Sequence, residues 1–118
     1  MKYLMLVYQD ENLLTEDVRE ECYAESSRLV DDIRSKGQFL GASPLYPTST
    51  ATSVRVRDGR TLVTDGPFAE TREQLGGYYL IDAANLDEAL SIAERIPAAR
   101  RGTIEVRPIV ELPQLSKA

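Results

Sequence analysis

Residues suited to acid–base chemistry gather just after position 64 of this sequence. The tetrapeptide Asp-Gly-Pro-Phe at 65–68 is a stiff turn, because its proline fixes its own φ and restricts the glycine before it. Such a loop can aim the carboxylate of Asp65, and the ring of Phe68 beside it could exclude water. Glu70 adds a second carboxylate, and a pair of carboxylates is typical of proton transfer. The structural alternative is that Asp65 caps its own turn and that Arg72 pairs with either carboxylate.

Tyrosines supply the second group of candidates. Tyr46 lies in a segment stiffened by two prolines, from which its hydroxyl could donate to a ligand, or its ring could simply pack over the loop. Tyr78 and Tyr79 lie on a predicted strand and would form one wall of a pocket. Phe68 and Thr71 complete the candidate ligand contacts.

Several kinds of site are excluded by composition. The chain has 118 residues, one cysteine and no histidine, which removes Ser-His-Asp, Cys-His and His-ligated metal sites from a single chain. The acidic residues show no calcium-loop spacing. We therefore expect neither a metal nor a cofactor. Cys22 cannot form an internal disulfide, which favours a reducing, cytoplasmic setting, and we expect it to be a small buried side chain rather than a reactive thiol.

The charge balance limits the partners. A net charge of −5 argues against general affinity for nucleic acid or an anionic membrane surface. The apolar run at 3–8 is too short to span a membrane or to be a signal-peptide core. Arginines near the end of the second helix could form a local positive patch, with a solvated surface as the alternative: Arg95, Arg100, Arg101 and Arg107.

The hydrophobic periodicity gives an order of elements that could position these groups. Thr15 is a good helix N-cap, and Gly37 is a good helix stop. Asp-Gly at 58–59 between two alternating runs is a strong hairpin signal. The predicted strands are 2–9, 39–42, 54–57, 60–63, 77–81 and 103–110; the predicted helices are 16–36 and a second between Asn85 and Pro97; 65–75 is a predicted loop.

This order, β-α-β, a hairpin, then β-α-β, predicts a ferredoxin-like α+β sandwich with both helices on one face of an antiparallel sheet. The first strand is apolar on both faces, since Leu4, Leu6 and Tyr8 alternate with other apolar residues. Two helices can cover only one face, so a second copy covering the other is the simplest solution, and a two-fold dimer with a barrel-like interior follows. The alternative is a monomer with the hairpin or tail folded over that face.

Two segments closely resemble the DGPF group of YCII-related proteins: 52–82, which contains the Asp-Gly-Pro-Phe motif, and 96–108. With the opening strand, the resemblance covers a single domain at 1–111, and leaves 112–118 as a loosely held tail. It implies a dimeric α+β barrel. Relatives include a dehydrochlorinase and, more distantly, muconolactone isomerase. Many members have a His–Asp pair that this chain lacks. Tyr46 lies where some relatives place the histidine, and Asp65 could be the acidic partner. The DGPF group is also often encoded beside sigma factors, which suggests a regulatory association.

Two function hypotheses follow. In the first, the protein is a cofactor-free lyase or isomerase acting on a small cyclic or aromatic compound, with Asp65 as base, aided by Glu70, and Tyr46 as donor to developing oxyanion charge. In the second, it is a non-catalytic module that binds a metabolite or docks to a sigma factor.

Overall fold

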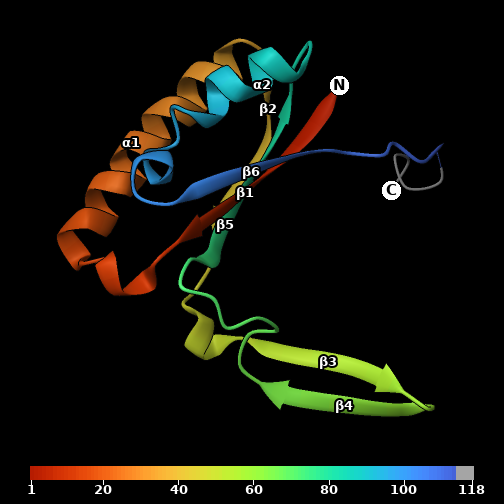
Figure 1. Ribbon diagram of the computed structural model, residues 1–118. Coiled ribbons are helices and arrows are strands. Elements are labelled where there is room, and N and C mark those ends of the chain that lie inside the picture. The colour runs from red at the N-terminus through yellow and green to blue at the C-terminus, as the bar shows by residue number, and fades with distance from the viewer. Residues whose placement is uncertain (114–118) are drawn as a thin grey trace.

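Four of the predicted strands form one antiparallel sheet in the computed structural model, which describes residues 1–113 (Figure 1). Its strand order is β2-β5-β1-β6, with each neighbouring pair antiparallel. Both helices lie on one side of this sheet (Figure 1). The predicted ferredoxin-like α+β arrangement is therefore confirmed. The strands of the sheet are β1 (Lys2–Gln9), β2 (Phe39–Pro44), β5 (Gln74–Asp82) and β6 (Thr103–Pro108).

Each of the two helices begins at a residue whose side chain caps it, as the residue types in the sequence indicate. In α1 (Glu16–Ser35), the Thr15 hydroxyl accepts from the backbone N–H of Val18 at 3.2 Å, and the chain leaves the helix at Gly37 with φ +73°. In α2 (Leu86–Ala93), the side chain of Asn85 accepts from the N–H of Glu88 at 2.9 Å. These contacts satisfy N–H groups that a helix start leaves without partners. Three short 3₁₀ segments complete the chain: η1 (Glu11–Leu13), η2 (Thr48–Thr50) and η3 (Pro97–Arg100).

The core lies between the helices and the sheet. Alternate residues of β1 and β5 are buried there, with Met5 and Ile81 fully covered. The spacing in the sequence predicts an apolar stripe on α1 through Val18, Cys22, Ser26, Leu29 and Ile33, of which only Leu29 and Ile33 are buried. It predicts a stripe on α2 through Leu86, Ala89, Leu90, Ala93 and Ile96, which is partly wrong, because Leu86 and Leu90 are about half exposed and the helix packs through the face that contains Ala89, Ile92 and Ala93.

A bulge moves the start of β5 ahead of its expected position. The strand begins at Gln74, inside the predicted loop, because the pairing with β1 skips Gly76 between two successive partners. A Cβ atom on Gly77 would lie 3.0 Å from the main-chain oxygen of Ser43 in β2. The main chains of β5 and β2 therefore approach too closely at Gly77 for a side chain to fit without a shift of the backbone.

The face of the main sheet away from the helices is apolar along β1 and β5, carries Glu105 and Arg107 on β6, and is only partly covered. Leu6 of β1 lies opposite Tyr78 of β5, and Leu4 lies opposite Leu80, all on this face. The Tyr78 side chain is 38% exposed. As the sequence predicts, the two helices leave this face to solvent in a single chain.

The hairpin of β3 (Thr52–Arg57) and β4 (Arg60–Asp65) forms a separate two-stranded sheet. The turn residues Asp58 and Gly59 take φ +52° and +73°, so the predicted Asp-Gly turn is confirmed. The hairpin extends away from the helices and the main sheet (Figure 1). It raises the Cα radius of gyration to 16.0 Å, against about 13.5 Å for a compact domain of this length.

The predicted tail at 112–118 falls largely outside the described residues, which end at 113. The chain before it is tied to β1, since the backbone N–H of Ile109 donates to the oxygen of Lys2 at 2.9 Å.

Candidate functional site

A cavity of about 730 Å³ opens between α1 and the edge of the sheet formed by β2 and β5. Leu29 and Ile33 of α1 are buried in the core and Val30 packs against it, whereas Arg19, Cys22 and Ser26, nearer the start of the helix, line the cavity. Its lining is mostly apolar and aromatic, with a few polar groups, which is the usual composition of small-molecule sites. The volume lies within the range of such sites.

Tyr79 is the most enclosed polar group of this cavity. It comes from the centre of β5, points to the helix side of the sheet and is 7% exposed. Burial raises the pKa of its phenol, the hydroxyl of Ser26 opposes this shift, and Cys22 and Glu25 raise the pKa further. The phenol therefore stays protonated at neutral pH and can donate a hydrogen bond to a ligand.

The α1 wall of the cavity meets η3 through two polar contacts. Arg101 donates to the sulfur of Cys22 at 3.1 Å, and Arg100 donates to both carboxylate oxygens of Glu25 at 3.0 Å. Cys22 is partly exposed and lines the cavity, so the expectation that it is a buried apolar side chain is wrong. The other two arginines of the predicted patch also contact carboxylates: Arg95 contacts Asp32 at 2.7 Å and Arg107 contacts Glu105 at 3.8 Å.

Glu11 is a carboxylate at the cavity that sequence reasoning missed. Its two oxygens accept from the backbone N–H and the hydroxyl of Thr48, each at 2.9 Å. Thr48 belongs to η2 and Glu11 to η1, so these contacts hold the segment before the hairpin against the segment that follows β1. Both contacts fix the orientation of Glu11, and its remaining lone pairs are available for a proton. The only signal in the sequence for Glu11 is its place in the polar run 9–12 at the end of β1.

Two further polar groups face the cavity without a protein partner among residues 1–113. The side-chain oxygen of Gln9 is fully buried and accepts no hydrogen bond. Arg19, in the first turns of α1, contributes to the lining, and its guanidinium forms no ion pair with residues 1–113. A buried acceptor without a donor is uncommon in folded proteins. Gln9 therefore suits a ligand that brings a hydroxyl or an N–H.

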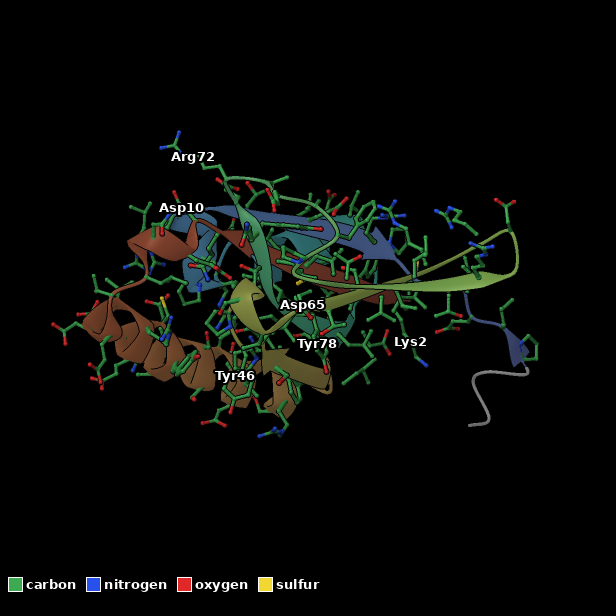
Figure 2. All side chains as sticks on the ribbon, turned by 90° about the horizontal axis from the view of Figure 1, so that it is seen from below. Lys2, Asp10, Tyr46, Asp65, Arg72 and Tyr78 are labelled. Atoms are coloured by element: carbon green, nitrogen blue, oxygen red, sulfur yellow. The ribbon has the colours of Figure 1, made fainter. Side chains whose placement is uncertain are left out.

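The predicted tyrosines all border the cavity, from different sides. Tyr46 follows β2 and lies at the rim, where it is 85% exposed. Tyr78 contributes to the lining, although the strand alternation puts its side chain on the open face of the sheet. Figure 2 shows both residues on the side of the molecule seen from below.

The acidic motif that the sequence favours lies elsewhere. Asp65 ends β4 and is exposed, as is Glu70, and neither lines the cavity of its own chain. Phe68 is 79% exposed, with the guanidinium of Arg55 at 5.3 Å from its ring centre. The loop is closed by its main chain: the N–H of Gly66, a residue at φ +107°, donates to the oxygen of Ala51 at 2.7 Å.

Thr71 lines a second, polar hollow together with Asp10 and Arg72. Arg72 pairs with Asp10 at 3.6 Å rather than with Asp65 or Glu70. Its side chain is 91% exposed and points outward near Asp10 (Figure 2). Because the guanidinium end of the pair is in solvent, this ion pair contributes little to stability.

Neither a metal cluster nor a membrane helix is present in the part of the chain that the structure describes. Residues 1–113 contain no group of three or more His, Cys, Asp or Glu side chains placed to hold a metal ion. None of the helices formed by these residues is long and apolar enough to cross a membrane.

Comparison with known proteins identifies the family. The family model of the YCII-related domain matches residues 1–113. The chain belongs to the YCII-related family. An uncharacterised protein of Rhizobium meliloti (strain 1021) is 40% identical to this YCII-related chain, over 92% of each.

A solved structure shows the same fold in a distant protein. The 5-chloro-2-hydroxyhydroquinone dehydrochlorinase of Burkholderia phenoliruptrix AC1100, solved in complex with 2,5-dihydroxybenzoquinone, superposes with a TM-score of 0.58. The alignment covers 97% of this chain and 98% of the dehydrochlorinase, with 14% identity. At that identity the likeness supports the α+β architecture and leaves the chemistry to the residues of this chain.

Proposed function

We propose that this YCII-related protein binds a small cyclic or aromatic compound in the cavity between α1 and the sheet edge. The observation that carries the proposal is the cavity itself, about 730 Å³ in volume, apolar for the most part and equipped with the protonated phenol of Tyr79. A flat ring fits between apolar walls, while a few polar groups fix its orientation. The dehydrochlorinase of similar fold binds a ligand of this class.

The catalytic form of the proposal is a cofactor-free lyase or isomerase reaction that begins with proton abstraction. Of the two carboxylates that line the cavity, Glu11 is the better candidate base, because Thr48 orients it, whereas Asp31 is paired with Arg34 at 3.6 Å. Tyr79 or Tyr46 would donate to the oxygen on which charge develops. Asp65 remains the alternative base predicted from the sequence. It does not line the cavity of its own chain, so it would have to act in the cavity of another copy.

Ligand binding is tested with 2,5-dihydroxybenzoquinone and simple hydroquinones as probes, by calorimetric titration. Ser26→Phe places a ring in the cavity and should abolish binding, whereas Ser91→Phe on exposed α2, outside the cavity, should leave it unchanged. Equal binding by both variants would contradict the site. Absence of binding by the unchanged protein across the panel would contradict the ligand class.

The two candidate bases are separated by a pair of isosteric substitutions. If a probe is turned over, Glu11→Gln should lower kcat by a factor of at least about 100, the size typical of a lost general base, and Asp65→Asn should leave it within a factor of two. The reverse result would assign the reaction to Asp65. Binding without turnover in every case identifies the non-catalytic form, a metabolite-binding module.

We further propose that the protein is a homodimer, located in the cytoplasm, in which two main sheets cover each other's open faces. The apolar side chains Leu4, Leu6 and Leu80 support this proposal, because they share that face with the exposed ring of Tyr78. Leu6→Lys should yield single copies in sedimentation at micromolar concentration. Thr103→Lys, at the edge of the same face on β6, should not.

A further inference from the structure

The hairpin of β3 and β4, called the arm below, has one apolar and one basic face. The strand register puts Val54 opposite Val63 and Val56 opposite Thr61 on the first face. On the second face, Arg55 lies opposite Leu62, and Arg57 lies opposite Arg60. Side chains on neighbouring strands share a face when they pair directly, so the arm is an amphipathic ribbon.

The valine face has no cover in a single chain. Val54, Val56 and Val63 are 65%, 60% and 66% exposed. A two-stranded hairpin on its own is marginally stable in water and normally needs an apolar surface to pack against. Six residues of extended strand carry the arm tip roughly 20 Å from its base. Figure 1 shows that this reach is directed away from the chain's own core.

The charges of the arm and of the rest of the chain indicate which partner the arm contacts. Over the whole arm, residues 52–65, three arginines stand against two aspartates, a net charge of +1, whereas the other 11 basic and 17 acidic residues of the chain give −6. The arm is thus a basic, apolar projection from an acidic body. A second copy of the same acidic body offers the complementary charge, which favours the approach of the arm as a whole, whereas the contact itself is made by the valine face.

We propose that the arm docks through its valine face on a second copy of this chain. In a two-fold dimer each arm reaches the other protomer, so the contact forms twice. The base of the arm also carries the 65–68 loop, which is fastened to it by the hydrogen bond from the Ser53 hydroxyl to the oxygen of Gly66 at 2.8 Å. Docking therefore fixes that loop beside the interface between the two copies.

The experiment compares two adjacent residues of β4 that point to opposite faces. Val63→Glu introduces a charge on the valine face, and Thr64→Glu introduces the same charge on the basic face. Sedimentation over a concentration series gives the dimer dissociation constant, and hydrogen exchange gives the protection of the arm amides. Circular dichroism verifies that the body of each variant is folded.

We expect the unchanged protein to be a dimer with protected arm amides. Val63→Glu should raise the dimer dissociation constant tenfold or more and remove the protection of the arm amides. Thr64→Glu should change the dissociation constant less than threefold. The proposal is overturned if Val63→Glu leaves both readouts unchanged, even where the dimer persists through the sheets. It is equally overturned if the unchanged protein sediments as single copies. Protection of the arm at dilutions where the chain is monomeric also refutes it, since the valine face would then pack on its own chain.

Discussion

Tyr79 gives the sharpest prediction, because a single buried hydroxyl links the cavity to the pH dependence of folding. Burial raises the pKa of this phenol above its ordinary value of 10.0. Stability associated with Tyr79 is therefore fully present below pH 10.0 and is lost as the pH rises from there towards the folded-state value. In that window the free energy of unfolding falls by up to about 1.4 kcal/mol per pH unit, because one more proton is bound in the folded state than in the unfolded state.

Tyr79→Phe removes the titration and retains the ring. At neutral pH the variant should lose about 0.5–1.5 kcal/mol, the usual net contribution of one hydrogen bond, because the Ser26 hydroxyl then lacks the phenol oxygen to which it donates. Above pH 10.0 its stability should decline less steeply than that of the unchanged protein, so that the two curves approach each other.

The assay is urea unfolding followed by circular dichroism at intervals from pH 7 to pH 11. Tyr78→Phe is the matched control, because it removes a neighbouring tyrosine whose side chain is 38% exposed on the open face of the sheet. Parallel alkaline curves for Tyr79→Phe and the unchanged protein would refute the reasoning, since burial of the phenol would then have no energetic consequence.

Three further predictions concern the scaffold. Gly102→Ala should destabilise the protein by more than about 2 kcal/mol, because the new Cβ would lie 2.0 Å from a main-chain oxygen of β1, whereas Gly41→Ala, with open space around it, should change urea stability little. Met5→Ala should cost about 2–5 kcal/mol in the same measurement, as expected for a fully buried side chain. The pKa of Asp32 is lowered, chiefly by a hydrogen bond from Arg95, so Asp32→Asn should flatten the loss of thermal stability as the pH falls below 3.8, and an acid limb as steep as that of the unchanged protein would contradict the pairing.

Local signals in the sequence were sufficient for most of the fold. The caps at Thr15 and Asn85 and the turn at Asp58 act through hydrogen bonds or dihedral angles of a few adjacent residues, and all three are present. The misplaced elements depend on distant partners. A helical stripe through Leu86 and Leu90 fits the periodicity as well as the buried stripe through Ala89 and Ile92 does. Only the position of the sheet selects the face that contains Ile92.

The candidate site was harder to predict. Tyr79 could be proposed as part of a pocket wall from the sequence, because it lies on a predicted strand that is apolar on both faces. Glu11 could not, since its orientation depends on Thr48, which is far away in the chain. Motif strength favoured Asp65, yet the motif lies at the base of the arm and outside the cavity.

What the sequence determined by itself is the order of elements, their caps and the excess of apolar residues over the surface that two helices can cover. These follow from periodicity and from interactions within a few residues. Only the tertiary structure decided where a cavity forms, because that depends on how far α1 stands from the sheet once Leu29 and Ile33 have packed. It also decided that the arm projects from the body, since no local interaction determines what a hairpin packs against.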